Sequence, residues 1–347
     1  MSAVRAMDTA RVIQVPQPYL LFLGHAQETT FMKTALGLRD WAHDLCIGEY
    51  RCDSTKVSIG LPYLDPASAY RAGARSLVIG VAGIGGTIDP RWIEYLVRAL
   101  EAGLDIVSGA HSKLSDCPAL KQTADRLGRA LIDVRVPPAD IPVATGRKRT
   151  GKRLLTVGTD CALGKKYTAL SLQRQFQARG IDADFRATGQ TGILISGAGI
   201  PIDAVVSDFV AGAAEILSPD AAEDHWDVIE GQGSVFHPSY AGVSLGLLHG
   251  SQPDVIVLCH EAGRQRIVGL EGYPTPSLRE AIDLTERLAR LTNPRVRCAG
   301  VSLNTSRLPE GDALQLLREI SLSLNLPVAD PMRPGRELDQ LVDSCLA

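Results

Sequence analysis

Short apolar runs recur along the whole of this chain, and amphipathic stretches separate them. The runs lie at 19–24, 76–83, 104–110, 130–136, 153–158, 182–189, 226–231, 254–260, 296–304 and 327–330. The amphipathic stretches include 89–103, 117–128, 277–291 and 311–326. Short continuous apolar runs are typical of parallel strands that are buried on both faces, because helices cover both sides of such a sheet. The alternation therefore predicts an α/β fold built from βαβ units with right-handed crossovers.

The length of 347 residues is more than one domain usually holds, and a break in the pattern divides it. Residues 137–153 contain three prolines and a basic cluster, and they show no apolar periodicity. Such a segment is typical of a linker. We therefore predict a first α/β domain over residues 1–140, a linker over 141–153 and a second α/β domain over 154–347.

The charge balance and the cysteines exclude several classes of protein. Lysine and arginine number 36 and aspartate and glutamate 39, so the net charge of −3 argues against general nucleic-acid binding. No apolar run approaches the ~18–20 residues of a membrane helix, and the first residues lack the apolar segment of a signal peptide. The seven cysteines are scattered without a CxxC pair, which indicates reduced thiols rather than a zinc site. We expect a cytoplasmic protein with no metal site and no membrane or nucleic-acid partner.

The most specific motif is RLLTVGTDCALGKKYTAL, at 153–170. An apolar strand leads into a glycine-containing loop, and the loop leads into a helix that we expect to begin near Gly164. Backbone N–H groups at such a helix N-terminus form an anion site, to which a lysine such as Lys165 adds a full positive charge. The residues that we expect to bind the phosphates of a cofactor are Gly158, Thr159, Asp160, Cys161, Gly164, Lys165, Lys166 and Thr168.

This loop departs from the motif G-x-x-x-x-G-K-[ST] in two ways. Five residues rather than four separate Gly158 from Gly164, and Lys166 stands where a serine or threonine would hold Mg²⁺. The next hydroxyl, on Thr168, comes two positions later. Because phosphoryl transfer depends strongly on the metal, the loop favours binding a phosphorylated cofactor over hydrolysing one. A pyrophosphate-containing cofactor such as coenzyme A fits, and the alternative is a tight turn that holds no ligand.

A second motif, WDVIEGQGS at 226–234, places an acidic residue and a glycine-rich loop at a strand end. In a parallel sheet this position faces the same edge as the phosphate loop. Glu230 can there hold a metal ion, act as a base, or simply cap the next segment. His237 follows seven residues later and is a second candidate base for an amine nucleophile. The alternative for His237 is an ordinary core or surface histidine.

Side chains near other strand ends are candidates for binding a substrate. They are Gln190, Thr191, Gln232, Arg264 and Arg266. An arginine can pair with a substrate carboxylate through two hydrogen bonds, whereas the alternative is a solvated loop. Cys161 stands at a helix N-terminus, where a thiol pKa can be lowered and an acyl-enzyme can form, although packing of a small residue is the simpler interpretation.

Three further stretches carry weaker signals. RKRTGKR at 147–153 has five basic residues in seven, and it can either reach the 3′-phosphate of coenzyme A or remain a solvated linker. SGAHSKLSD at 108–116 follows a strand of the first domain, and VAGIGG at 81–86 does not match the pattern G-x-G-x-x-G. We therefore interpret the first domain as a platform that covers the cleft or mediates oligomerisation.

GTDCALGKK resembles the phosphate loop of dethiobiotin synthetase and its cobyrinate-amidase relatives, which has the same extra residue, and EGQGS resembles their second motif. The whole chain resembles more specifically a bacterial family of formerly unknown function. That resemblance implies an N-terminal Rossmann-like domain and a C-terminal P-loop NTPase-like domain. Members of the family include D-glutamate N-acetyltransferases, which use acetyl-CoA. The matching stretches are SGAHSKLSDCPAL (108–120), LGRALIDVR (127–135), GTDCALGKKYTA (158–169), ATGQTG (187–192), EGQGSVFHPSYAGVSLGLLHG (230–250) and LCHEAGR (258–264).

The resemblance and the altered loop together favour an N-acetyltransferase. It would move the acetyl group of acetyl-CoA to a small acidic amino acid, D-glutamate first, by direct attack of the amine in a ternary complex. The alternative is a ligase or kinase-like enzyme of the dethiobiotin synthetase type that uses ATP with Mg²⁺, the metal being held by Glu230 or Thr168. A third hypothesis is a nucleotide-sensing binding protein. We expect a homo-oligomer, since symmetric assemblies are common among enzymes.

Overall fold

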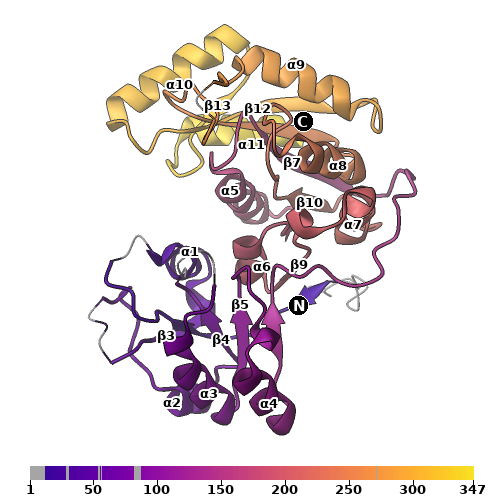
Figure 1. Cartoon of the computed structure of the whole chain (residues 1–347). Helices are drawn as coiled ribbons and strands as arrows, with labels where there is room; N and C mark the ends of the chain where they lie inside the picture. The colour runs from indigo at the N-terminus through magenta and orange to yellow at the C-terminus, as the bar shows by residue number, and fades with distance from the viewer. Residues whose placement is uncertain (1–11, 29–30, 54, 56, 82–86, 271) are drawn as a thin grey trace. The chain divides into compact units, whose positions relative to one another are not determined.

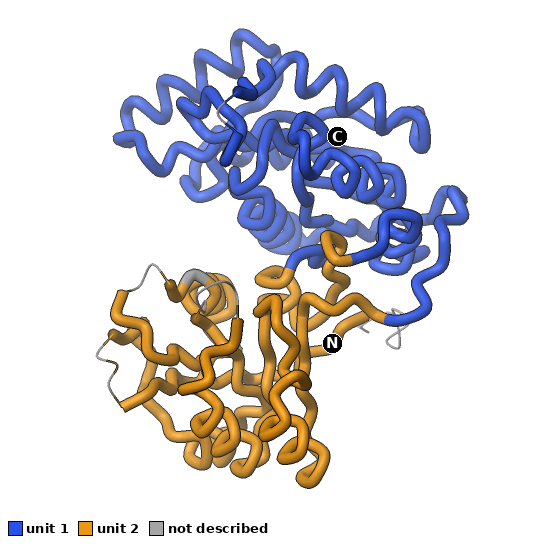
Figure 2. The backbone as a smooth tube through the Cα atoms, viewed as in Figure 1, with its two compact units in different colours: residues 1–11, 139–189, 205–347 blue, residues 12–138, 190–204 orange. Residues whose placement is uncertain are grey.

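The structure of the chain is a computed structural model that describes residues 12–28, 31–53, 55, 57–81, 87–270 and 272–347. Residues 82–86 of the glycine cluster and the N-terminal stretch 1–11 lie outside this description. The chain forms two compact units (Figure 2), with residues 139–189 and 205–347 in unit 1 and residues 12–138 and 190–204 in unit 2. No helix within the described ranges has the length and apolar character that a bilayer span requires.

Unit 2 is built on a five-stranded parallel sheet (Figure 1). Its strands are β2 (Tyr19–Phe22), β3 (Cys46–Tyr50), β4 (Ser76–Ile79), β5 (Asp105–Ser108) and β6 (Leu131–Asp133). Its first helices are α1 (Lys33–Trp41), α2 (Pro66–Arg71), α3 (Ile93–Glu101) and α4 (Pro118–Leu127), with short 3₁₀ helices at His43–Leu45, Pro90–Trp92 and Leu114–Asp116. The strand order β3-β2-β4-β5-β6 is that of a doubly wound sheet. The predicted Rossmann-like architecture is confirmed.

A segment from later in the chain completes unit 2. It forms helix α6 (Gln190–Ser196), strand β9 (Ala198–Gly199) and a 3₁₀ helix (Ile202–Ala204). Strand β9 pairs antiparallel with β1 (Ile13–Gln14), α6 packs against α1, and the Tyr19 hydroxyl donates to the carbonyl of Leu194 at 2.9 Å. The units therefore divide differently from the expected boundaries, which placed all of 154–347 in one domain. The physical reason is that the apolar side chains of α6 are buried within unit 2.

Unit 1 is built on a six-stranded parallel sheet in the order β13-β12-β11-β7-β10-β8. The strands are β7 (Lys152–Gly158), β8 (Ala183–Arg186), β10 (Trp226–Ile229), β11 (Val255–Glu261), β12 (Arg297–Asn304) and β13 (Val328–Ala329). The helices are α5 (Lys165–Ala178), α7 (Val210–Leu217), α8 (Ala241–Ser251), α9 (Leu278–Ala289), α10 (Glu310–Leu324) and α11 (Arg336–Leu346), with a 3₁₀ helix at Ser207–Phe209. Helices α5 and α11 share one buried core with the sheet, and α8 and α9 pack on β7 and β11. The predicted P-loop-like sheet is confirmed.

Each apolar run that predicted a strand overlaps one, and each of the four amphipathic stretches overlaps a helix. Strand β3 was not predicted, because Gly48 and Glu49 interrupt its apolar character. Glu49 is nevertheless fully buried, and its carboxylate accepts the backbone N–H of Ile59 at 2.9 Å and pairs with Arg51. A buried carboxylate is stable only when such partners surround it, and a single sequence does not show them.

Helices α7 and α8 pack closely because α8 carries glycines at the contact. A Cβ atom on Gly250 would lie 2.3 Å from the carbonyl oxygen of Ala211, and one on Gly246 would lie 2.6 Å from Cγ1 of Val210. Gly242, in the first turn of the same helix, has no atom within 4 Å of the equivalent position. Helix α8 also packs on β7. The close contacts at Gly246 and Gly250 therefore set the distance between α7 and the helix that covers this strand.

We predict that Gly250→Ala lowers the free energy of unfolding by about 1–3 kcal/mol, because the added methyl group overlaps a backbone carbonyl that cannot rotate away. Gly242→Ala is the matched control, and a helical alanine in open space leaves stability unchanged or raises it by up to about 1 kcal/mol. Urea unfolding of the two variants measures both effects. Equal stability of the two variants would contradict the close α7–α8 packing.

Candidate functional site

The loop between β7 and α5 has the geometry of a phosphate-binding loop. It turns through residues with positive φ angles, Ala162 at 54° and Gly164 at 106°, and α5 begins at Lys165 directly after them. The Lys165 side chain is buried, and its Nζ donates to the backbone carbonyl of Asp160 at 2.8 Å. Burial lowers the pKa of Lys165. A helix N-terminus with a lysine beside the loop is suited to binding an anion. A bound anion would also stabilise the charged form of Lys165, which burial disfavours.

Asp160 connects the loop to the segment that follows β11. Its side chain is fully buried, and one carboxylate oxygen accepts both the guanidinium of Arg264 and the backbone N–H of Val268 at 2.8 Å. Arg264 also pairs with Glu261, through an Nε–Oε2 hydrogen bond of 2.7 Å. The prediction that Arg264 binds a substrate carboxylate does not fit, because two carboxylates of the protein already engage its guanidinium.

The hydroxyl groups near the loop face the interior of unit 1. Thr168 Oγ1 bonds to the Gly164 carbonyl at 3.1 Å and to Ser302 Oγ, on β12, at 2.8 Å. Thr159 Oγ1 bonds to Nδ1 of His260 at 2.8 Å. Thr168 is therefore occupied by contacts with the sheet, and the position that usually supplies a Mg²⁺ hydroxyl is Lys166.

Glu230 lies at the carboxyl end of β10 and is buried. Its Oε2 accepts the backbone N–H groups of Thr188 at 3.0 Å and Gly189 at 3.1 Å. Burial raises the pKa of Glu230 to about 7, although Lys166, the two N–H bonds and Lys165 act in the opposite direction. A carboxyl group with this pKa exchanges a proton readily near neutrality, as a general base must.

Gly231 brings the loop after β10 against β7. A Cβ atom on Gly231 would lie 1.7 Å from the carbonyl oxygen of Thr156, and the Gly231 N–H donates to Thr156 Oγ1 at 2.9 Å. Gln232 follows, and its Nε2 donates to Thr188 Oγ1 at 3.0 Å. Of the predicted substrate ligands, Gln232 is thus joined to the segment that holds Glu230. Thr188 is a contact that sequence reasoning missed, although its stretch ATGQTG was recognised.

His237 lies beside the phosphate loop, in the turn before α8. Its side chain is buried, and its Nδ1 accepts the backbone N–H of Ser239 at 3.1 Å. The neutral ring therefore carries its proton on Nε2 and is a hydrogen-bond donor at that atom. Of the two predicted bases, Glu230 therefore offers a carboxyl oxygen and His237 an N–H group.

The side chains of Asp160, Cys161 and His237 offer three possible metal-ligand atoms within 4.8 Å of one another. Both Asp160 oxygens already accept hydrogen bonds, from Cys161 N and from Arg264 and Val268. Burial raises the pKa of the Cys161 thiol, so it is neutral rather than a thiolate. The hypothesis of a lowered thiol pKa is therefore wrong, and the cluster does not have the free anionic ligands that a metal requires.

The remaining predicted substrate ligands lie elsewhere. Gln190 and Thr191 open helix α6, which belongs to unit 2. Arg266 is exposed, in a segment that forms an isolated antiparallel bridge with Pro274.

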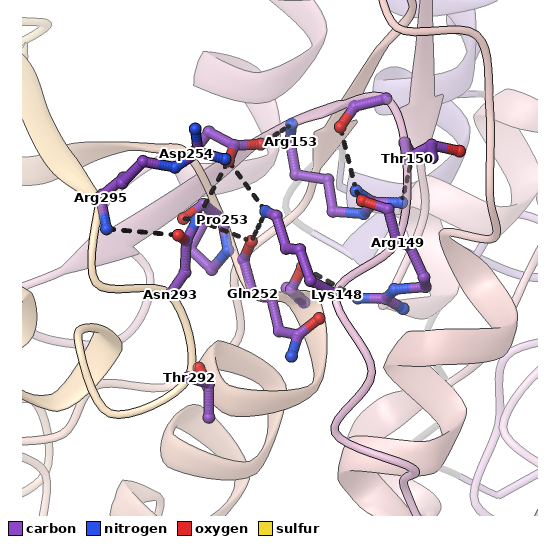
Figure 3. Close-up of polar contacts among 12 residues, drawn as sticks. Lys148, Arg149, Thr150, Arg153, Gln252, Pro253, Asp254, Thr292, Asn293 and Arg295 are labelled. Carbon is purple, nitrogen blue, oxygen red and sulfur yellow. Dashed lines mark hydrogen bonds and ion pairs between the residues drawn. The ribbon is translucent and has the colours of Figure 1, made fainter.

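The basic cluster at 147–153 lies at the start of β7, at the opposite end of the strand from the phosphate loop. Figure 3 shows the polar contacts of its side chains. Lys148 Nζ donates to Asp254 at 2.8 Å. The buried Arg149 donates to the carbonyl of Ser251 at 3.0 Å, so it caps the end of α8. Arg153, also buried, donates to Ser218 Oγ at 2.8 Å. The cluster therefore stabilises unit 1, and the idea that it reaches a phosphate of the bound cofactor is not supported.

These features define the class of protein. A doubly wound unit accompanies a parallel sheet in which a strand, a glycine-containing loop and a lysine-headed helix form a P-loop. Residues 142–342 match the P-loop domain of a domain of unknown function, DUF1611, and residues 47–137 match its Rossmann-like N-terminal domain. The chain belongs to the DUF1611 family.

Individual relatives are similar to this chain over nearly its whole length. A D-glutamate N-acetyltransferase of Tritonibacter scottomollicae is 49% identical over 333 residues, which cover 96% of this chain and 99% of the relative. A D-glutamate N-acetyltransferase of a Pseudoalteromonas species is 46% identical over 335 residues, with coverage of 96% and 99%. The crystal structure of a DUF1611 family protein from Anabaena variabilis is 33% identical, with a TM-score of 0.81 over 95% of this chain and 99% of that one.

We predict that Arg264→Ala lowers the free energy of unfolding by about 3–5 kcal/mol, because it leaves Asp160 buried without its cationic partner. Arg307→Ala is the matched control, since Arg307 is 82% exposed and pairs with the same Glu261 at 3.4 Å. An exposed pair of this kind contributes about 0–1 kcal/mol. Chemical denaturation compares the two variants. Wild-type stability in Arg264→Ala would show that Arg264 does not support the loop.

Proposed function

We propose that this protein is an N-acetyltransferase that moves the acetyl group of acetyl-CoA to the amine of D-glutamate. The observation that carries the proposal is the buried Glu230 carboxyl, whose pKa of about 7 suits a base that deprotonates an amine. Two relatives that match 96% of this chain are named D-glutamate N-acetyltransferase, and this similarity supports the proposal.

The phosphate loop would hold the pyrophosphate of the acetyl donor. The backbone N–H groups at the start of α5 and the ammonium of Lys165 supply the positive charge, and Asp160 with Arg264 keeps the loop in shape. Acetyl-CoA supplies an acetyl group already activated as a thioester. Binding of this kind needs no metal, which agrees with the internal contacts of Thr168.

Glu230 would accept the proton that the amine loses as the new C–N bond forms and the C–S bond breaks. Protonated Glu230 then gives this proton to the released thiolate, directly or through water, so the products are the amide and free coenzyme A thiol and the base is regenerated. The Nε2–H of His237 is the donor that would stabilise the negative charge on the carbonyl oxygen, because Lys165 is assigned to the pyrophosphate. This assignment gives His237 a donor role because Ser239 occupies its Nδ1.

The ATP- and Mg²⁺-dependent alternative is less well supported. Magnesium prefers ionised carboxylates and hydroxyl or water oxygens. Thr168 is bonded to Ser302, and Glu230 has a pKa of about 7 and accepts two backbone N–H groups. Neither Thr168 nor Glu230 therefore offers the free, ionised or hydroxyl oxygen that magnesium prefers.

The direct test is a release assay with the full chain. Free thiol from acetyl-CoA and phosphate from ATP are measured against a panel of D- and L-amino acids, with and without EDTA. We expect thiol release with D-glutamate that EDTA does not reduce. Phosphate release that needs Mg²⁺ would favour the ligase, and tight binding of acetyl-CoA without turnover of any amino acid would favour a binding protein.

We predict that Glu230→Gln lowers kcat/KM by about 10²–10⁴-fold, because the amide cannot accept the proton. In the wild type kcat/KM should rise with pH through about 7, since the base must be ionised, and the variant should lose this inflection. Glu223→Gln, at an exposed site near the start of β10, is the control. A pH–rate profile of each variant decides: an inflection near pH 7 that survives in Glu230→Gln would remove Glu230 from the reaction.

A further inference from the structure

Unit 2 contains a pocket to which the proposed reaction assigns no ligand. Its volume is about 490 Å³, and it lies beyond the carboxyl ends of β5 and β6. The stretch SGAHSKLSD forms one side of it. In open α/β sheets, ligands bind at this end of the strands. The charged and polar lining residues are His111, Ser112, Lys113, Asp133, Arg135 and Asp203.

The cations of this pocket are more available than its anions. Lys113 is exposed, and among the described residues its ammonium group makes no ion pair. Arg135 is oriented by an Nε–H bond of 2.7 Å to the carbonyl of Gly109, and its only ion pair in the described chain is a 3.8 Å contact with Asp203. Both oxygens of Asp133, in contrast, accept the backbone N–H of Leu114, at 3.0 and 3.2 Å.

An acidic amino acid brings two carboxylates that need cationic partners. Of the two predicted partners in unit 1, Arg264 is occupied by Asp160 and Glu261, and Arg266 lies at an exposed position. We infer that the pocket of unit 2 binds the carboxylates of the acidic amino acid, with Lys113 and the oriented guanidinium of Arg135 as its charge partners. This inference rests on the proposed acetyl transfer, whose substrate it localises.

The test compares Lys113→Ala with Lys113→Arg and with Lys121→Ala. Lys121 is an exposed lysine of α4 that pairs with Asp125 and does not line the pocket, so it is the matched control. Steady-state kinetics with D-glutamate and with D-glutamine separate a charge effect from a structural one. We expect Lys113→Ala to raise KM for D-glutamate at least about tenfold, with KM for acetyl-CoA unchanged. The preference for D-glutamate over D-glutamine should fall, Lys113→Arg should retain most of it, and Lys121→Ala should match the wild type.

Two results would overturn the inference while leaving acetyl transfer intact. One is a Lys113→Ala variant with wild-type KM for D-glutamate, and the other is a rise only in KM for acetyl-CoA, which would assign the pocket to a phosphate of the donor. If the wild type transfers no acetyl group, calorimetric titration with D-glutamate replaces the kinetics. Binding that Lys113→Ala weakens then supports the pocket without the reaction, and no binding, or binding that the variant leaves unchanged, refutes it.

Discussion

The close approach of Gly231 to strand β7 determines how the candidate site is assembled. With a side chain on Gly231, a carbon atom would lie 1.7 Å from the Thr156 carbonyl, so only glycine permits this contact. The contact brings the loop after β10 against the strand that opens the phosphate loop. As a result, Glu230 and Lys165 are buried at the same edge of one sheet, and each lowers the cost of burying the other's charge.

Burial then decides what each ionisable group can do. Glu230 and Lys165 lack a direct ion pair in the described structure. Burial therefore raises the pKa of Glu230 and lowers the pKa of Lys165, which favours the neutral form of each. Asp160 is also fully buried, but Arg264 and backbone N–H groups compensate its charge. The same region therefore contains two buried groups without a direct ion pair and one buried carboxylate whose charge is compensated, and the difference lies in the number of partners each group has.

The sequence predicted most of the strands, the loop and the position of Glu230 at a strand end, because each depends on a local pattern: apolar runs, glycine spacing and the end of a strand. It did not predict the roles of Arg264 or Thr168, since their partners Asp160 and Ser302 are distant in sequence. Helix α6 lies in unit 2, although the predicted boundaries place its residues in the second domain, for a similar reason. Its apolar residues signal burial but do not say which core receives them, and only the packing within unit 2 answers that.

The central claim is that the loop after β7 binds the acetyl donor through backbone N–H groups and Lys165, without a metal. Calorimetric titration of acetyl-CoA into the full chain, in EDTA and in Mg²⁺, tests it most directly when it is repeated with Lys165→Ala. We expect equal affinity with and without Mg²⁺, and binding at least about tenfold weaker in the variant, which loses a charge-assisted contact. Unchanged affinity in Lys165→Ala, or binding that requires Mg²⁺, would contradict it.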